Sequence, residues 1–267
     1  MYPNTEPDFK HKLIIRKARK TAIKHPSSIG QKKAGIISLS VIIPTYNAAR
    51  TIKATITALD TAEKAGISLE LIVVDANSTD ETACLAEKLG ARVIYCEKGR
   101  GPQLIAGSKA AKGDWLLFLH ADTVLGAGWA ASIVVFASQK SNLDRAAVFT
   151  FALDTKSRAS ERLTQMVRFR NKWLGLPYGD QGLLIYRRFY KRTGGYKPWP
   201  LMEDVDLVRR IGNSKIALFD TVAITSAERY ISDGYLKRIT RNFLCLFLYF
   251  IGVSPKLISK IYNTTNT

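Results

Sequence analysis

Short apolar runs alternate with helix-patterned segments from residue 39 onward, and this alternation most constrains how the chain can fold. The first run, Leu39 to Ile43, is rich in β-branched residues and closes at Pro44, as a buried strand does. Further strands are predicted at 69–74, 92–95 and 115–119, and helices at 48–65, 78–90, 102–111 and 129–139. Repeated strand–helix units of this length predict an α/β fold with a mostly parallel sheet flanked by helices.

Beyond residue 145 the pattern loosens, although the chain still reads as one domain. The elements predicted here are strands at 146–153 and 182–186, a basic helix at 158–173, a hairpin at 215–225 around Asp220, and C-terminal helices at 234–251 and after Pro255. Another helix is expected to begin between Met202 and Asp206 and to end near Gly212. In the first half, Ser78 and Glu81 have the spacing of a capping box at a helix start.

The chain is strongly basic, with 40 Lys and Arg against 22 Asp and Glu and a formal net charge of +18. Such a surplus favours an anionic partner: nucleic acid, a phosphorylated ligand or an acidic membrane surface. Nine of the basic residues and no acid lie within 10–33. We interpret residues 1–38 as a solvated, poorly ordered basic arm, with a targeting segment or an anionic-surface anchor as the alternatives. Elsewhere the basic residues are scattered and no nucleic-acid motif occurs, so no nucleic-acid partner is expected.

Cysteine content and hydropathy bear on the location of the protein. The three cysteines have no close pair, which excludes a disulfide framework and a Cys-based zinc site and fits a reducing compartment. No signal peptide is visible, and the longest apolar run, Phe243 to Ile251, has nine residues, too few to span a membrane. We therefore expect a cytoplasmic protein. The terminal helix, basic at its start and then apolar, is either buried against the sheet or interfacial, so peripheral contact with the anionic inner face of the membrane stays open.

Polar residues follow each of the four strands predicted in the first half, which is where ligands bind in open parallel sheets. These residues are Pro44 to Asn47, Asp75, Glu97 to Gly101 and His120 to Thr123. Neither a G-x-G-x-x-G fingerprint nor a P-loop occurs, so those two phosphate cradles are excluded. The residues that remain suit a base and ribose, an arginine for phosphate and an aspartate for a divalent cation.

Four ordered blocks resemble the signatures of family 2 glycosyltransferases, which are inverting enzymes with the GT-A (Rossmann-like) fold. The blocks are Val41–Asn47, Val73–Asp80, Phe118–Asp122 and Met202–Leu207, and the resemblance covers residues 39–262. It implies a nucleotide-binding half at 39–123, an acceptor half at 124–232 and C-terminal helices at 233–262. Further blocks resemble a bacterial radical-SAM/selenodomain-associated subgroup that is linked to arsenosugar biosynthesis: Gly99–Gln103, Leu176–Gln181, Leu201–Asp204 and Leu248–Pro255.

The resemblance implies a nucleotide-diphosphate sugar as donor. The residues that would bind it are Pro44, Thr45, Tyr46, Asn47, Asp75, Arg100 and Asp122. Asp75 would hydrogen-bond the base or ribose, or instead form a turn at the strand end. Arg100 would bind the diphosphate, and Asp80 would serve the donor or only the helix start.

A divalent cation, Mn²⁺ or Mg²⁺, is implied as cofactor. Asp122 corresponds to the last acid of the family's D-x-D metal motif, while His120 stands at its first position. Imidazole ligates manganese but is a poorer ligand for magnesium than a carboxylate, so the identity of the metal stays open. His120 is a metal ligand, a phosphate donor or a partner for a local carbonyl.

The acidic cluster of residues 203–206 would supply the general base. Neighbouring carboxylates raise one another's pKa, and by resemblance Asp204 removes the proton of the acceptor hydroxyl, with Glu203 as an accessory. Asp206 is expected to pair with Arg210 at i,i+4 instead.

An acceptor site is expected in the second half of the chain. Asp180 and Gln181 would grip acceptor hydroxyls or form an Asx turn. Trp199 would stack on a sugar face or pack as an ordinary aromatic residue. The sequence leaves open the sugar, the nucleotide, the acceptor and the oligomeric state. A sugar nucleotidyltransferase or another nucleotide-sugar-binding protein is the alternative function.

Overall fold

The computed structural model describes residues 36–155, 157–174 and 179–264, with side chains described up to residue 167 in the second range and residue 262 in the third. From Gly35 onward the chain forms one compact unit. The strands are β1 (Ile37–Thr45), β2 (Ile67–Asp75), β3 (Arg92–Tyr95), β4 (Trp115–Phe118), β5 (Thr123–Leu125), β6 (Ala146–Leu153), β7 (Leu183–Tyr186) and β8 (Ile216–Thr225).

The α-helices are α1 (Ala49–Thr57), α2 (Thr82–Lys88), α3 (Arg100–Ala110), α4 (Trp129–Ala137), α5 (Arg158–Leu174), α6 (Arg187–Arg192), α7 (Glu203–Ile211), α8 (Glu228–Asp233), α9 (Tyr235–Phe250) and α10 (Pro255–Thr264). Short 3₁₀ helices are η1 (Glu63–Ala65), η2 (Lys140–Asn142), η3 (Gly179–Gln181) and η4 (Asn213–Lys215). No helix of the described residues has both the length and the apolar character needed to cross a bilayer.

The described strands form one eight-stranded sheet in the order β3-β2-β1-β4-β7-β6-β8-β5. The first four of these pair in parallel, β7 joins antiparallel to both β4 and β6, and β6 and β8 are again parallel. The carboxyl ends of β1, β2 and β4 therefore meet at one edge of the sheet, as the alternation of strands and helices predicted.

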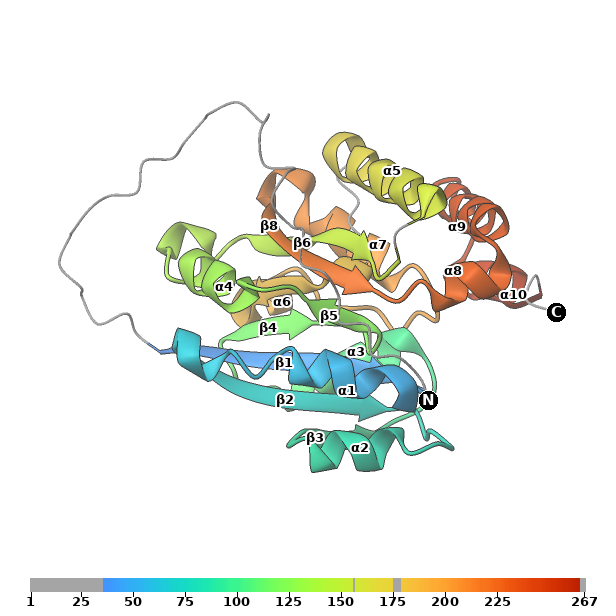
Figure 1. Ribbon diagram of the computed structural model, residues 1–267. Coiled ribbons are helices and arrows are strands. Elements are labelled where there is room, and N and C mark those ends of the chain that lie inside the picture. The colour runs from blue at the N-terminus through green and yellow to red at the C-terminus, as the bar shows by residue number, and fades with distance from the viewer. Residues whose placement is uncertain (1–35, 156, 175–178, 265–267) are drawn as a thin grey trace, which may run out of the picture. The chain divides into compact units, whose positions relative to one another are not determined.

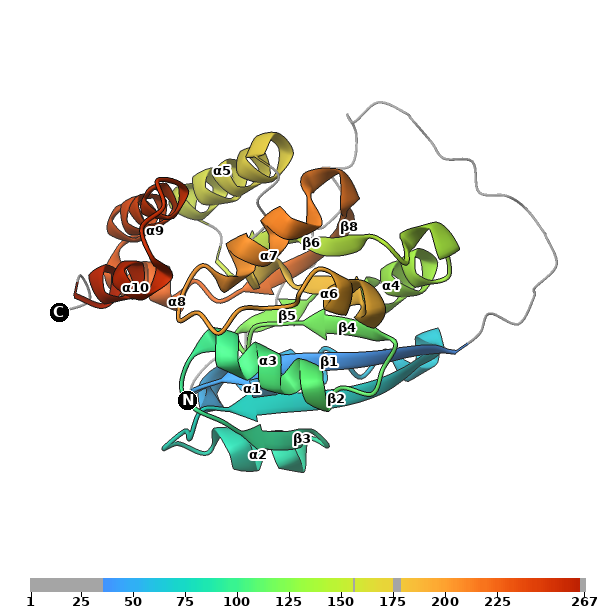
Figure 2. The same cartoon turned by 180° about the vertical axis from the view of Figure 1, so that it is seen from behind.

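Period-two alternation along β1 divides the core into two layers. Leu39, Val41 and Ile43 face a cluster that includes residues of α1, α2 and α4, whereas Ile42 faces the cluster with α3, α6 and α7. Figures 1 and 2 show α1 and α4 on one side of the sheet and α3, α6 and α7 on the other. The α/β architecture with helices on both faces is confirmed.

Two predicted helices start or end elsewhere than expected. The helix predicted at 48–65 ends at Thr57, because the carbonyl of Ala58 accepts a hydrogen bond from Trp129 Nε1 (2.9 Å) and the chain tightens into turns before η1. The capping box is wrong: Ser78 Oγ donates to Asp75 (2.6 Å), and α2 begins only at Thr82. Asp80 serves that helix start, since its carboxylate accepts the backbone N–H of Thr82 (3.1 Å).

The hairpin predicted at 215–225 is also wrong. The segment forms one strand, β8, whose register against β6 shifts between Phe149 and Thr150. The shift leaves Asp220 and Thr221 as extra residues of β8, so the polar signal at Asp220 marks a β-bulge and not a turn. Sequence patterns also gave no sign of β5, α6 or α8. The expected basic arm at 1–38 lies outside the described residues except for 36–38, and Ile37 and Ser38 already belong to β1.

Candidate active site

The loops after β1 and β2 are locked together by an internal network. Asp75 is fully buried, and its carboxylate accepts from Thr45 Oγ1 (2.9 Å) and from the backbone N–H (2.7 Å) and Oγ (2.6 Å) of Ser78. Asn47, with a positive φ of 49°, accepts from the backbone N–H of Thr79 (2.9 Å) and donates its own to Ser78 Oγ (2.9 Å). These contacts fix the backbone of the two loops, which form the rim of the sheet at the carboxyl ends of β1 and β2.

The N-terminus of α3 is tied to the same rim. Gln103 is buried, and its Nε2 donates to the carbonyls of Thr45 (2.7 Å) and Val74 (2.8 Å). Gly101 lies so close to the segment 197–199 that an added Cβ would come within 2.6 Å of the Trp199 oxygen. The first turn of α3, with Arg100 at its start, is therefore held between the strand ends and this segment.

The first turn of α7 presents two adjacent carboxylates toward Arg100. Glu203 is buried, and among the described residues neither of its oxygens has a hydrogen-bond partner; Arg100 Nε lies 3.6 Å from its Oε1. Burial and the charge of Asp204 raise the pKa of Glu203 to about 7, although Arg100 acts in the opposite direction. Asp204 is instead well bonded: its carboxylate accepts the backbone N–H groups of Gly179 (2.9 Å) and Val205 (2.7 Å).

These groups line one small cavity together with His120. Its polar lining comes from Arg100, His120, Gly179, Glu203 and Asp204, and its apolar walls from Leu104, Phe118, Leu119, Leu183 and Tyr196. Burial and the charges of Arg100 and Arg229 hold the pKa of His120 well below its usual range, so its imidazole is neutral near pH 7. Burial disfavours the charge of Arg100, but nearby carboxylates, including Asp122, raise its pKa above its ordinary value.

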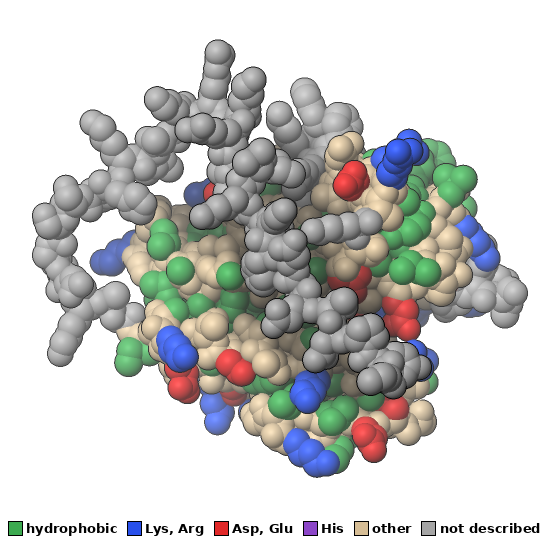
Figure 3. Space-filling model, viewed as in Figure 1, with side chains coloured by type: hydrophobic (Ala, Val, Ile, Leu, Met, Phe, Trp, Pro, Cys, Tyr) green, Lys and Arg blue, Asp and Glu red, His purple; other side chains and the backbone are tan. Residues whose placement is uncertain are grey.

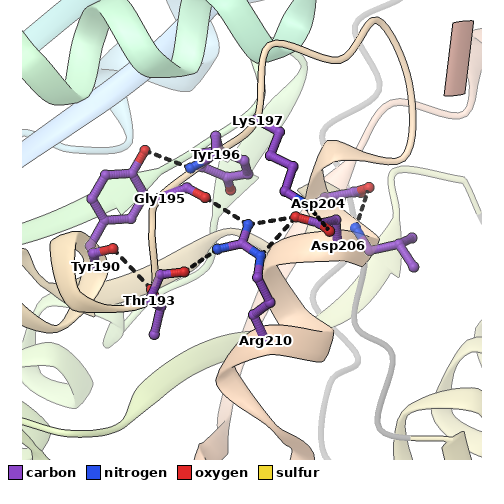
Figure 4. Close-up of polar contacts among 9 residues, drawn as sticks. Tyr190, Thr193, Gly195, Tyr196, Lys197, Asp204, Asp206 and Arg210 are labelled. Atoms are coloured by element: carbon purple, nitrogen blue, oxygen red, sulfur yellow. Dashed lines mark hydrogen bonds and ion pairs between the residues drawn. The ribbon is translucent and has the colours of Figure 1, made fainter.

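The helix α7 is braced by a partly buried ion-pair network (Figure 4). Asp206 accepts from Lys197 Nζ (3.1 Å) and from Nε of Arg210 (2.8 Å), as the predicted i,i+4 pair requires. Arg210 also donates to the carbonyls of Thr193 and Gly195. The segment 193–199 therefore joins α7, which carries the two acids, to the start of α3, which carries Arg100.

The comparison with protein families decides what kind of protein this is. The sequence model described as glycosyl transferase family 2 matches residues 40–194, more than half of the chain. The chain belongs to glycosyl transferase family 2. That match ends before Glu203 and Asp204, so those two residues rest on the geometry and on the resemblance of their own block.

Curated relatives of this family 2 chain carry glycosyltransferase names. An uncharacterized glycosyltransferase of Rickettsia bellii is 33% identical over 142 residues, 50% of this chain and 46% of that protein. A PGL/p-HBAD biosynthesis glycosyltransferase of Mycobacterium bovis is 38% identical over 93 residues, 32% of this chain and 36% of that protein. The chain thus spans less than half the length of these relatives.

Solved structures show that the family 2 chain has the GT-A fold. S. aureus TarS (residues 1–349) superposes with a TM-score of 0.57 at 18% identity, covering 72% of this chain and 61% of that chain. Glucosyl-3-phosphoglycerate synthase from Mycobacterium tuberculosis, crystallised with Mn²⁺, UDP and glucosyl-3-phosphoglycerate, gives 0.50 at 21% identity, covering 71% and 70%.

Several expected ligand residues of this family 2 protein bond within the protein. Thr45 and Asp75 are buried and bond each other, so a bound base would have to compete with these contacts. Gln181 is fully buried and donates to the carbonyl of Phe149 (2.9 Å). Trp199 contacts Tyr249 of α9 (6.4 Å between ring centroids), as the packing alternative expected.

Other expected residues lie where a ligand can reach them. Tyr46 is exposed, and Lys98 Nζ lies 3.6 Å from the centroid of its ring. Pro44 and Asp180 are half-buried, and the remainder of the block before Asp180, Leu176 to Tyr178, lies outside the described residues. Sequence reasoning missed Gln103 and Gly179. Gln103 stands in the block Gly99–Gln103 and Gly179 in the block Leu176–Gln181, but neither residue was given a role of its own; Gln103 ties α3 to the strand ends, and the N–H of Gly179 orients Asp204.

The side chains that follow β4 fit a divalent cation that a bound ligand also coordinates. Among the described residues no three His, Cys, Asp or Glu side chains gather as a metal cage. Asp122 and His120, whose imidazole is neutral, follow β4 in the chain and could supply one oxygen and one nitrogen ligand. Cations that bind through one or two protein groups complete their coordination with phosphate oxygens and water.

Proposed function

We propose that this family 2 protein transfers a sugar from a nucleotide-diphosphate sugar to an acceptor hydroxyl, with inversion at the anomeric carbon. The observation that carries the proposal is the single cavity lined by Arg100, His120 and Asp204, three residues that lie far apart in the chain. One cation, one imidazole and one oriented carboxylate in one cavity provide the groups that such a transfer needs.

A diphosphate donor is supported by the charge of the site and by the neighbours. Arg100 lies at the N-terminus of α3, where the helix dipole also favours an anion. Besides the UDP complex described above, a mannosyltransferase from Pyrobaculum calidifontis was crystallised with GDP-Man and Mn²⁺ (TM-score 0.50, 18% identity). Tyr46 and Pro44 would contact the base at the exposed rim.

Asp122 and His120 would hold a Mn²⁺ or Mg²⁺ ion against the diphosphate. Bound there, the ion would neutralise part of the charge that grows on the diphosphate as it leaves. Arg100, which lines the same cavity as His120, would also stabilise this charge.

Asp204 would act as the general base. Two backbone N–H groups hold its carboxylate in one orientation, so it need not reorganise before the reaction. It would accept the proton of the acceptor hydroxyl while that oxygen attacks the anomeric carbon opposite the diphosphate. Asp180 would bind another acceptor hydroxyl. The blocks shared with the arsenosugar-linked subgroup favour an unusual small acceptor, and the cytoplasm remains the expected location.

The test compares Asp204→Asn with wild type. We expect turnover of UDP- and GDP-sugars to fall by about 10²–10⁴, the usual contribution of a general base. Binding of the nucleoside diphosphate, followed by thermal shift with and without Mn²⁺, should stay unchanged. Asp220→Asn, an exposed carboxylate on the bulge of β8, is the matched control.

Two results would overturn the proposal. Unchanged turnover in Asp204→Asn would show that Asp204 is not the general base. Release of pyrophosphate in place of a nucleoside diphosphate would show a sugar nucleotidyltransferase, the alternative function.

A further inference from the structure

Helix α9 (Tyr235–Phe250) carries an apolar stripe on its exposed side. Leu236, Phe243, Phe247 and Phe250 are spaced by seven, four and three residues and therefore share one face. Phe243 is 68% exposed and Phe247 is 53% exposed. Single exposed apolar residues are ordinary, but a continuous stripe of large ones marks a contact surface. Figure 3 shows hydrophobic side chains gathered at the α9 end of the molecule.

The neighbouring face of α9 is packed against α7. Leu246 is buried in a cluster with Val205 and Val208 of α7, the helix that begins with Glu203 and Asp204. Tyr249 contacts the ring of Trp199, and the guanidinium carbon of Arg209 lies 5.0 Å from the ring centroid of Phe250 at the edge of the stripe. The exposed stripe therefore borders a face of the helix that already has its partners.

The charged residues of the segment that follows Asp233 are all basic. No acid follows Asp233, whereas five basic residues do: Lys237, Arg238, Arg241, Lys256 and Lys260. Arg238 and Arg241 pair with Asp233 (2.8 and 2.9 Å) and fix the start of α9. Lys237 and Lys256 are exposed. An apolar stripe bordered by lysines is the pattern of a helix that lies in the interface of an anionic bilayer.

We propose that the α9 stripe, defined as Leu236, Phe243, Phe247 and Phe250, docks on an anionic lipid surface. The aromatic side chains enter the boundary between headgroups and acyl chains, and the lysines bind the headgroups. Because a helix is about 10 Å across, docking also brings the first turn of α7 close to the lipid. The inference does not depend on the proposed transfer reaction.

The test is co-sedimentation of the full chain with vesicles at 50 mM and 500 mM NaCl. Vesicles of phosphatidylcholine alone are compared with vesicles that contain about one third phosphatidylglycerol. We expect binding to the anionic vesicles only, and at least a tenfold loss of partitioning at the higher salt concentration. Phe243→Ser/Phe247→Ser should lose at least tenfold as well, whereas Val135→Ser, an exposed apolar position on α4, should bind as wild type does.

Failure of the wild-type chain to bind anionic vesicles at low salt would overturn the proposal. Binding that persists in Phe243→Ser/Phe247→Ser would also overturn it, because the contact would then lie elsewhere. Sedimentation velocity gives a third outcome: a dimer that dissociates in this variant would assign the stripe to a second copy of the chain. Unfolding curves of each variant show that the fold is kept, and unchanged binding of UDP with Mn²⁺ keeps a failure here distinct from a failure of the proposed function.

Discussion

Replacing Glu203 by Gln should change how the stability of the protein depends on pH. Glu203 is buried beside Asp204, and among the described residues its oxygens have no hydrogen-bond donor. Its pKa rises from an ordinary value of 4.5 to about 7. Glutamine has nearly the same shape but carries no charge at any pH in this range. The substitution therefore removes one titration and little packing.

The sign and the magnitude follow from the two pKa values. Between pH 4.5 and 7 the folded state holds a proton on Glu203 that the unfolded state has released, so the free energy of unfolding falls as pH rises. A pKa difference of 2.5 corresponds to about 3 kcal/mol when fully expressed. Integrated from pH 5 to pH 8, the loss is about 2–3 kcal/mol. Glu203→Gln lacks this loss, so relative to wild type it should gain about that much over the interval.

Urea unfolding at pH 5, 6, 7 and 8, followed by circular dichroism, measures the effect. The difference between wild type and variant at each pH cancels the titration of all groups that both proteins share. Glu228→Gln, at an exposed carboxylate, is the control and should follow wild type. Parallel stability curves for wild type and Glu203→Gln would refute the reasoning. A relative loss in the variant as pH rises would show that the pair with Arg100 outweighs burial.

Three further predictions concern the surroundings of the cavity. Gly101→Ala should destabilise the protein by about 1–3 kcal/mol in urea unfolding, because its Cβ would collide with the backbone of Trp199; an unchanged midpoint would contradict that contact. Gln103→Leu should lower the free energy of unfolding by about 2–4 kcal/mol in the same assay, because the carbonyls of two strand ends lose their hydrogen-bond donor. A decrease below about 1 kcal/mol would mean that water replaces the lost donor. His120→Asp should raise the affinity for Mn²⁺ in the presence of UDP by tenfold or more, because it adds a second carboxylate ligand. Calorimetric titration measures this affinity, and an unchanged value would place residue 120 outside the metal site.

The sequence predicted the location of the site better than the contacts of its residues. Alternation of strands and helices predicted that polar residues at strand ends would meet at one edge of the sheet. Arg100 and His120, which follow β3 and β4, do line one cavity, and the alternation of strands and helices accounts for this result. Asp204 lines the same cavity from the start of α7, a position that only the resemblance of its own block implied.

The direction of individual side chains could not be predicted in the same way. Asp75 ends a parallel strand whether its carboxylate faces a ligand or turns back to Ser78, and both outcomes use the same residue type. Gln181 is polar in a turn-rich segment, yet it is fully buried because β6 has a carbonyl at Phe149 to pair with it. The outcome at Gln181 depends on a partner far along the chain, which local patterns do not contain. Among contacts between near neighbours, the pair of Asp206 with Arg210 was predicted correctly, whereas the capping box of Ser78 and Glu81 was not.

The charges of the cavity favour a ligand that arrives with a cation. Three carboxylates, those of Asp122, Glu203 and Asp204, act on the guanidinium of Arg100. A diphosphate entering alone would add negative charge next to these acids, with Arg100 and the more distant Arg229 to offset it. A divalent cation bound with the diphosphate would reverse that balance, and the proton that Glu203 holds up to about pH 7 would reduce the repulsion further. The electrostatics of the first turn of α7 therefore favour a donor bound as its metal complex, and they explain why a buried acid without a hydrogen bond is tolerated beside the proposed base.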